Sequence, residues 1–170
     1  MKIAIRQIII EADIDRIIAQ FITQGDNKPR EIWETYFREQ ESGERIVIIA
    51  ETDGEIAGYV TLFPKVKDAV PYREQGIPEI KDFHVFEKFQ RRGIGSALMD
   101  KIEAIAAEYA DTVCLGVGLH SGYGTAQRMY VKRGYVPDGS GAWDGTASAE
   151  PYGMVENGDD LLLYMSKKLR

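Results

Sequence analysis

Residues 45–63, RIVIIAETDGEIAGYVTLF, constrain the fold of this chain more than any other segment. Two apolar runs rich in β-branched residues flank the dipeptide Asp53-Gly54. An Asp-Gly pair between such runs is typical of a tight β-hairpin, because Asp and Gly tolerate the positive φ that its turn requires. The segment therefore predicts two neighbouring antiparallel strands, against which other parts of the chain have to pack.

The patterns on both sides of this hairpin predict strands and helices. Residues 1–10 indicate a strand, and two amphipathic helices follow, one from Glu11 and one over about 30–40, because their apolar residues recur at spacings of three and four. After the hairpin comes a polar connection at 64–78, which contains three prolines. The later elements are strands at 79–86, 112–119 and 161–169, and helices from residue 94 and over about 125–134.

The length and composition are typical of one soluble globular domain. The chain has 170 residues, of which 44% are hydrophobic and 28% charged. Residues 135–160 are dense in Gly, Pro, Ser and Asp and predict a long loop. We therefore expect a mixed α/β (α+β) fold in a single domain that spans residues 1–170.

Several classes of protein are disfavoured by the composition. No apolar run approaches the roughly 20 residues of a membrane span, and the N-terminal segment lacks a signal-peptide cleavage site, so we expect no membrane association and a cytoplasmic location. The formal net charge of −6 argues against nucleic-acid binding. The single cysteine, Cys114, and the two histidines have no metal-ligand spacing, so we expect no metal. Cys114 lies in an apolar run and is expected in the core.

Residues 90–96, QRRGIGS, form a basic, glycine-containing segment directly before an apolar helical pattern. The first turn of an α-helix exposes backbone N–H groups and carries the positive end of the helix dipole. Glycines allow close approach to that backbone, while the two arginines and the serine add positive charge and a hydroxyl donor. Phosphate or pyrophosphate is the ligand that fits such a segment.

Other glycine motifs fit the sequence less well. A Rossmann fingerprint would need a third glycine where Leu98 stands, and it would follow the first strand. A P-loop would need Gly-Lys-Ser/Thr, which the chain lacks. The purely structural alternative is that Gly93 and Gly95 only start a helix tightly beneath a strand.

A second motif lies about 30 residues later, and the two together resemble the GNAT superfamily of acetyl-CoA-dependent N-acetyltransferases. The first motif is Gln90-Arg91-Arg92-Gly93-Ile94-Gly95, and the second is Ala126, Tyr130, Gly134 and Tyr135. The resemblance implies a mixed, mostly antiparallel sheet of about six or seven strands flanked by about four helices, with the fourth and fifth strands splayed to form a cleft for coenzyme A.

The resemblance also implies how acetyl-CoA is held. The backbone of residues 90–96 would bind the pyrophosphate, and Phe83, His84 and Val85 at the end of the preceding strand would pair with the pantetheine arm. The imperfect alternation of residues 79–86 suits a bulged strand.

The resemblance assigns Tyr130 as the general acid that protonates the departing thiolate. An ordinary tyrosine has a pKa near 10 and is protonated at neutral pH. Glu79 is the first candidate for the general base, with Asp82 and His84 as alternatives on the same strand. A base acting through water, and the absence of any dedicated base, also stay open.

The acceptor site of this family is built from the first two helices, the loop between them and the last strands. Candidate residues are Trp33, Tyr36, Phe37, Trp143 and Tyr152. Trp33 and Phe37 share a helix face, which favours a place in the core for both, whereas Trp143 fits a substrate contact or a subunit contact as well as a packing role. The chain departs from relatives at Tyr123, where an asparagine is common, so the role of that asparagine cannot be transferred to this chain. Tyr123 or His120 could line the cleft or pack the loop.

These observations predict an enzyme that transfers an acetyl group from acetyl-CoA to a primary amine of a small molecule or a protein, by direct attack in a ternary complex. The alternative is a non-catalytic acyl-CoA-binding module that senses acetyl-CoA. Another acyl chain, such as succinyl, is also open. A homodimer through the C-terminal strands or the late loop is a further expectation.

Overall fold

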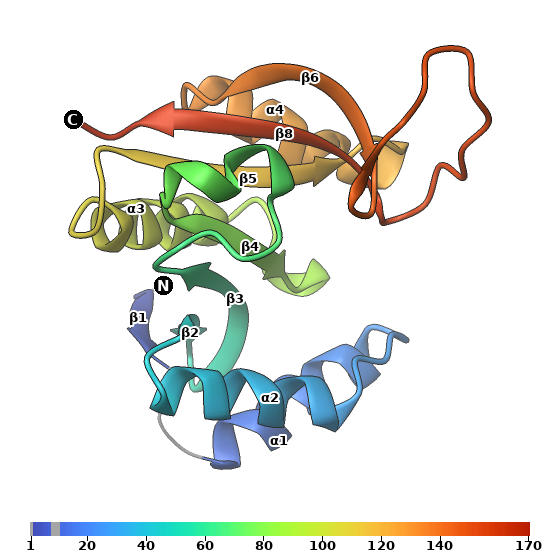
Figure 1. The fold of residues 1–170 in the computed structure, drawn as a ribbon. Coiled ribbons are helices and arrows are strands. Elements are labelled where there is room, and N and C mark those ends of the chain that lie inside the picture. The colour runs from blue at the N-terminus through green and yellow to red at the C-terminus, as the bar shows by residue number, and fades with distance from the viewer. Residues whose placement is uncertain (1, 8–10) are drawn as a thin grey trace. The chain divides into compact units, whose positions relative to one another are not determined.

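The computed structural model describes residues 2–7 and 11–170. Within them the chain is a mixture of strands and helices, which confirms the predicted α/β (α+β) class (Figure 1). The strands are β1 (Ala4–Gln7), β2 (Ile46–Thr52), β3 (Glu55–Phe63), β4 (Glu79–Val85), β5 (Thr112–Gly118), β6 (Val136–Asp144), β7 (Ala147–Ser148) and β8 (Leu161–Lys168). The helices are α1 (Glu11–Thr23), α2 (Arg30–Glu41), α3 (Ile94–Ala106) and α4 (Gly124–Lys132), with 3₁₀ turns η1 (Val70–Gln75), η2 (Glu87–Phe89) and η3 (Ser121–Tyr123).

The chain divides into two compact units. The first consists of Met1–Pro64 and Ile80–Ile105, and the second of Lys65–Glu79 and Ala106–Arg170. The single domain and the splayed fourth and fifth strands stay predictions. The predicted N-terminal strand is present as β1; residues 1 and 8–10 of that prediction lie outside the described residues.

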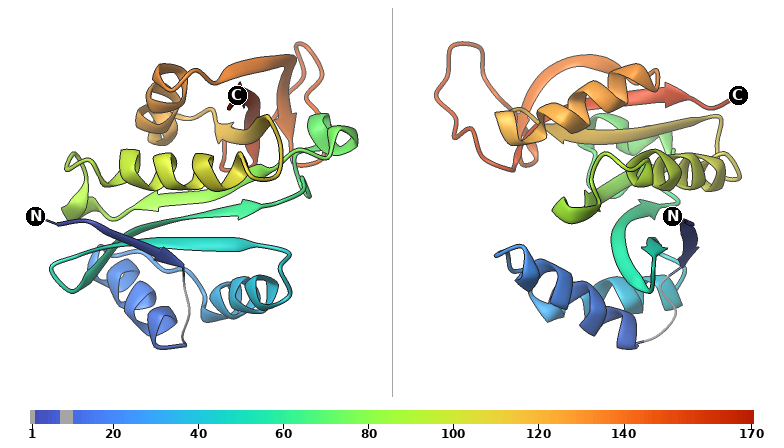
Figure 2. Two further views of the ribbon diagram at one scale, coloured as in Figure 1. Left: turned by 90° about the vertical axis from the view of Figure 1, so that its left-hand side faces the viewer. Right: turned by 180° about the vertical axis from the view of Figure 1, so that it is seen from behind.

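The first unit is built on the predicted hairpin. Strands β2 and β3 pair antiparallel from Ile46 opposite Leu62 to Thr52 opposite Glu55, and both turn residues, Asp53 and Gly54, have positive φ. The strand order in this unit is β1-β2-β3-β4. Helices α1 and α2 lie on one face of these strands and α3 lies on the other (Figure 2). The buried residues of α1 and α2 are Asp13, Ile14, Ile17, Phe21 and Trp33.

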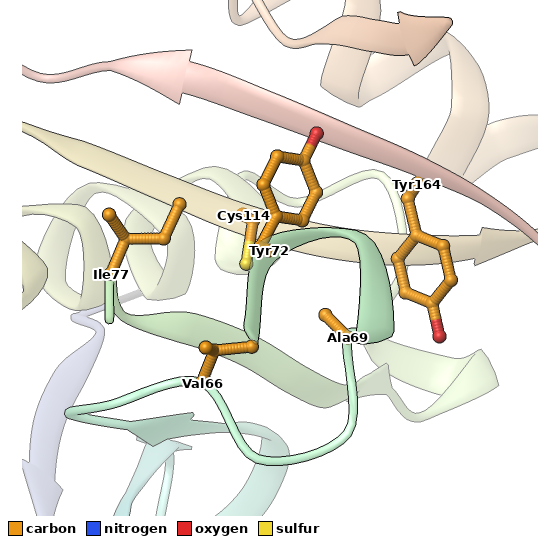
Figure 3. Packing of buried hydrophobic residues seen from close by; sticks show 6 residues of the cluster. All are labelled: Val66, Ala69, Tyr72, Ile77, Cys114 and Tyr164. Carbon is orange, nitrogen blue, oxygen red and sulfur yellow. The ribbon is translucent and has the colours of Figure 1, made fainter. Parts of the chain in front are cut away.

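The second unit has the strand order β5-β8-β6-β7. Residues 64–78, predicted as a connection, contain η1, and the residues around this turn pack on β5 and β8 (Figure 3). The cluster consists of Val66, Ala69, Tyr72, Ile77, Cys114 and Tyr164. Cys114 is fully buried, as predicted, and burial raises the pKa of its thiol well above the ordinary value.

The prediction of one long loop over residues 135–160 is wrong for its first part. Residues Val136–Asp144 form β6, which pairs with β8 from Val136 opposite Ser166 to Asp144 opposite Leu161. The register shifts between Pro137 and Ala142, where glycines with positive φ interrupt the strand. This irregular backbone explains the loop-like composition. Ala147 and Ser148 form β7, which pairs with the end of β6. Residues 149–160 do form a loop, which extends away from the strands of this unit in Figure 1.

Candidate active site

The glycine-containing segment adopts a turn that only some residues tolerate. It follows β4 and η2 and leads into α3, which begins at Ile94. Arg91 has φ of 57° and Gly93 has φ of 82°, both in the left-handed region. A Cβ at Gly93 would meet nothing within 4 Å, so glycine is needed here for its backbone conformation and the space in front of it is open. The Gln90 side chain fixes the turn by donating through Nε2 to the Val85 carbonyl at 3.0 Å.

The amide groups of this turn have the arrangement expected of an anion site. The Ala97 N–H donates to the Gly93 carbonyl at 3.0 Å. The N–H groups of residues 94–96 come before this hydrogen bond, so they have no acceptor within the helix. The change from left-handed Gly93 to helical Ile94 creates the concave arrangement of N–H groups that binds anions. Residues 90–93 are exposed and the guanidinium of Arg92 lies 5.9 Å from the Phe89 ring centroid. These features fit a pyrophosphate group.

The strand before this turn departs from regular geometry, as its imperfect alternation predicted. Asp82, in the middle of β4, has φ of 52°, which interrupts the extended conformation just before the three residues expected to pair with pantetheine. The neighbouring strand β3 passes unusually close at Gly58, where an added Cβ would lie 2.6 Å from the His84 carbonyl oxygen. Gly58 is therefore needed for this approach.

His84 and Asp82, two of the candidate bases, lie in one group of side chains in the first unit. The Asp82 carboxylate accepts hydrogen bonds from Tyr36 Oη at 2.7 Å and Tyr59 Oη at 3.0 Å, and it pairs with the ammonium of Lys28. Burial raises the pKa of Asp82, but the charge and hydrogen bond of Lys28 and the two phenols lower it by more, so the pKa lies below the ordinary value. Asp82 is therefore a stable anion.

The His84 ring stacks on Phe21 with centroids 5.2 Å apart, and its Nε2 lies 3.3 Å from Nε2 of Gln24. Burial lowers the pKa of His84, Asp82 raises it, and Lys28 lowers it further, with a net lowering. The imidazole is consequently neutral at pH 7 and carries an unprotonated ring nitrogen.

Glu79 has contacts that explain its burial without catalysis. Its Oε2 accepts hydrogen bonds from the backbone N–H groups of Lys67, Asp68 and Ala69 at 3.0–3.2 Å, and its exposed fraction is 3%. The carboxylate thereby ties the residues after Pro64 to the start of β4. Its role as general base stays a prediction.

Tyr130 is in the second unit, on α4, and is 6% exposed. Its ring makes an edge contact with Tyr135, with centroids 5.6 Å apart. Burial, with a smaller contribution from Tyr123, raises the pKa of the Tyr130 phenol well above its ordinary value. The phenol stays protonated throughout the physiological range, as a general acid toward a thiolate requires.

Tyr123 and His120 pack the loop before α4. A Cβ at Gly118 would lie 2.2 Å from the Tyr123 ring, so this ring lies directly on the strand backbone. Tyr123 Oη donates to Asp159 Oδ1 at 2.9 Å, and His120 Nε2 lies 3.0 Å from the same oxygen. The Gly122 N–H donates to His120 Nδ1 at 3.0 Å. These bonds tie η3 to the late loop.

Trp143, an aromatic candidate for acceptor contact from the late loop, is part of the second unit. Its Nε1 donates to Ser140 Oγ at 2.7 Å, and its ring contacts Tyr164 with centroids 6.1 Å apart. Trp143 also packs against the cluster drawn in Figure 3. Tyr152, in contrast, is fully exposed. Contact of Trp143 or Tyr152 with an acceptor stays a prediction.

Sequence reasoning missed Lys28 and Tyr59 as members of the group around Asp82. Lys28 Nζ donates to Tyr59 Oη at 3.0 Å as well as pairing with Asp82. Tyr59 is one of several apolar residues of the hairpin and Lys28 stands in a polar connection, so neither has a local pattern that distinguishes it. Only contacts between residues that are far apart along the chain identify them.

Comparison with known proteins identifies the family. Residues 13–135 match the model of the acetyltransferase (GNAT) family, which is more than half of the chain. The chain belongs to the GNAT family. The resemblance inferred from the two motifs is confirmed, and GNAT proteins are acetyltransferases. No curated protein matches the chain.

Solved acetyltransferase structures share the fold at low sequence identity. An N-acetyltransferase from Staphylococcus aureus Mu50 has a TM-score of 0.72 at 14% identity, covering 100% of both chains. A ribosomal-protein-alanine N-acetyltransferase from Brucella melitensis has a TM-score of 0.69 at 18% identity, covering 97% of this chain and 99% of its own. The yncA protein of Salmonella typhimurium, solved with its cofactor acetyl-CoA, has a TM-score of 0.69 at 16% identity, covering 100% of this chain and 95% of its own. These similarities confirm the fold.

Two further observations apply to the described residues. None of the helices formed by residues 2–7 and 11–170 has the length and apolar character needed to cross a bilayer. In the same part of the chain, no group of three or more His, Cys, Asp and Glu residues is arranged to hold a metal ion.

Proposed function

We propose that this GNAT protein is an N-acetyltransferase that transfers the acetyl group of acetyl-CoA to a primary amine in a ternary complex. The observation that carries this proposal is the turn at residues 90–96, in which left-handed Gly93 precedes the exposed first turn of α3. Such a turn binds the anionic end of a ligand through backbone N–H groups. Acetyl-CoA bound to the yncA protein supports the choice of this ligand.

The chain's residues have separate roles in this proposal. The amides of residues 94–96 hold the pyrophosphate, assisted at the rim by Gln90, Arg91 and Arg92. The backbone of Phe83, His84 and Val85 receives the pantetheine arm. When bound, acetyl-CoA supplies an activated thioester. Tyr130 donates a proton to the coenzyme A sulfur as the C–S bond breaks.

We favour His84 over the other two candidates as the group that takes the proton from the amine. Its imidazole is neutral at pH 7, while the carboxylate of Asp82 is stabilised as an anion by three partners. The Oε2 of Glu79 accepts three backbone hydrogen bonds. In this proposal Asp82 holds charge and His84 removes the proton, directly or through water.

The experiment is release of free thiol from acetyl-CoA across a panel of primary amines, with calorimetric titration of acetyl-CoA in parallel. Tyr130→Phe is expected to lower turnover at least about tenfold and to leave acetyl-CoA binding nearly intact, because only the proton donor is lost. The matched control is Tyr109→Phe, because Tyr109 is an exposed tyrosine of the chain.

The outcomes separate the alternatives. Turnover that Tyr130→Phe leaves unchanged would remove Tyr130 from the mechanism. Acetyl-CoA binding without thiol release for any amine would favour the sensor module. Faster turnover with succinyl-CoA than with acetyl-CoA would show that the transferred group is succinyl and not acetyl. The cytoplasmic location and the homodimer expected from the sequence stay predictions.

A further inference from the structure

The connection between α1 and α2 places a lysine ammonium among three aromatic rings. Lys28 Nζ lies 4.9 Å from the ring centroid of Trp33, 5.3 Å from that of Tyr36 and 5.1 Å from that of Tyr59. Asp82 supplies the counter-charge. All three ring distances fall within about 6 Å, where a ring face attracts a cation. We call Trp33, Tyr36, Tyr59 and Asp82 the ammonium cage.

The counter-charge of the ammonium cage is placed by an uncommon backbone conformation. Asp82 has φ of 52°, in the left-handed region that residues other than glycine seldom occupy. Such positions are concentrated at ligand sites, where the surrounding structure maintains the strain. The phenols of Tyr36 and Tyr59 both donate to the Asp82 carboxylate, so its two oxygens are fixed in position. The cage is therefore organised around one anion.

Stability alone is a weak reason for a lysine at position 28. Burial of the side chain lowers the pKa of Lys28, and the attraction of Asp82 offsets this effect only in part. A charge pair taken out of water contributes little net stability, and an apolar residue often replaces it without loss. The cage thus has the chemistry of ammonium recognition, and Lys28 is its present occupant.

The occupant is held in a way that permits exchange. Lys28 is part of the connection Gln24–Pro29 and of no helix or strand. Its side chain is 16% exposed and that of Asp82 is 23% exposed, so solvent reaches both members of the ion pair. A free ammonium group can therefore approach Asp82 as Lys28 withdraws.

We propose that the ammonium cage binds a primary alkylammonium group of the acceptor substrate, and that Lys28 occupies the cage until this group displaces it. This inference rests on the proposed acetyltransferase function for the identity of the ligand as acceptor. Lys28 Nζ donates hydrogen bonds to both Asp82 and Tyr59 Oη. A primary ammonium has three N–H donors and reproduces both bonds, whereas a quaternary ammonium has none. The cage therefore selects primary over quaternary ammonium.

The burial that lowers the pKa of Lys28 acts on any ammonium in its place. An acceptor amine bound in the cage therefore loses its proton more readily than the same amine does in water. His84, whose ring centroid lies 6.0 Å from that of Tyr59, is close enough to the cage to receive that proton through water.

The binding experiment uses Lys28→Ala and propylammonium chloride, because propylammonium replaces the atoms that the substitution removes. We expect Lys28→Ala to bind propylammonium at least about tenfold more tightly than the wild type, since the internal competitor is gone. Tetramethylammonium is expected to bind at least about tenfold more weakly than propylammonium to the same variant. Lys88→Ala is the matched control, because Lys88 lies over the Phe89 ring at 4.9 Å but pairs with Glu55 on the surface.

Displacement in the wild type is tested directly by NMR. Saturation with propylammonium is expected to move the ε-carbon resonance of Lys28 to the position of a solvent-exposed lysine, while the Lys88 resonance does not move. Equal affinity of wild type and Lys28→Ala for propylammonium, or a Lys28 resonance that does not respond at saturation, would overturn the proposal. Tyr36→Phe, which removes one hydroxyl and no charge, provides a second variant, and it is expected to weaken propylammonium binding about threefold.

Kinetics distinguish this proposal from the one on which it rests. If the protein transfers acetyl groups, Lys28→Ala is expected to lower the KM for propylamine at least about fivefold, because the competitor is removed. A structural role for Lys28 predicts the opposite, a raised KM. Displacement of Lys28 without acetyl transfer to any amine would contradict the proposed function and leave the ammonium site supported. Acetyl transfer without displacement would contradict the ammonium site alone.

Discussion

In our proposals the glycine-containing turn and the ammonium cage bind opposite charges by different means, and both lie in the first unit. The turn presents the backbone N–H groups of consecutive residues 94–96, so its binding depends on φ angles more than on side-chain charge. The cage is assembled from side chains of α2, β3 and β4, and its binding depends on one carboxylate and three rings. The comparison predicts that backbone changes impair the turn and charge changes impair the cage.

The largest expected effect is at Gly93. A valine at a φ of 82° either changes the turn or retains strain of about 2 kcal/mol, so Gly93→Val is expected to weaken acetyl-CoA binding about thirtyfold. Arg91→Ala removes only a charge at the rim and is expected to weaken binding about threefold. Calorimetric titration with acetyl-CoA measures both. The reverse order of the two variants would contradict binding through the backbone.

A smaller effect is expected at Asp82, where the substitution changes a charge and leaves the backbone as it is. Asp82→Asn keeps the shape of the side chain and removes the cage's negative charge, so the KM for a primary amine is expected to rise about tenfold. The affinity for acetyl-CoA is expected to stay within about twofold of the wild type, because the turn does not use this charge. A loss of acetyl-CoA binding as large as the change in KM would show that the two sites are not independent.

These two sites also differ in how far the sequence predicts them. The turn is one continuous segment, and the hairpin around Asp53-Gly54 is likewise local, so spacing and residue type were enough to predict the backbone of both. The ligand of the turn stays a proposal. The cage depends on contacts between residues far apart, such as Lys28 and Asp82, which are 54 positions apart. No period or motif marks Lys28. Residues brought together only by the fold need the structure.

Strand β6 and the contacts of Glu79 are two further features that local patterns do not indicate. Strand β6 was predicted as loop because its glycines and proline disrupt the alternation of a strand, yet its ends pair with β8 on both sides of the register shift. Glu79 is the first candidate for the general base on the family resemblance, and that role stays a prediction. The structure shows that Oε2 binds three backbone amides, which no spacing indicates.

A further expected effect is on stability and depends on pH. The folded-state pKa of Asp82 lies below its ordinary value of about 4, so its ionised form contributes stability above that pH, and this contribution disappears as the pH falls through the lowered folded-state pKa. The free energy of unfolding of the wild type is therefore expected to exceed that of Asp82→Asn at pH 6 by about 1–2 kcal/mol. Urea denaturation at pH 6 and at pH 3 measures the difference, which should shrink at pH 3. A difference that grows with acidification would have the wrong sign.

Backbone amide NMR tests most directly whether the molecule has two independent sites of opposite charge. Acetyl-CoA is expected to shift the amide resonances of Gly93–Ser96 and to leave the indole N–H of Trp33 in place. Propylammonium is expected to shift the Trp33 indole resonance and to leave the amides of Gly93–Ser96 in place. Acetyl-CoA that leaves Gly93–Ser96 unmoved, or propylammonium that shifts those amides in place of Trp33, would contradict the assignment of the turn to the anion and of the cage to the amine.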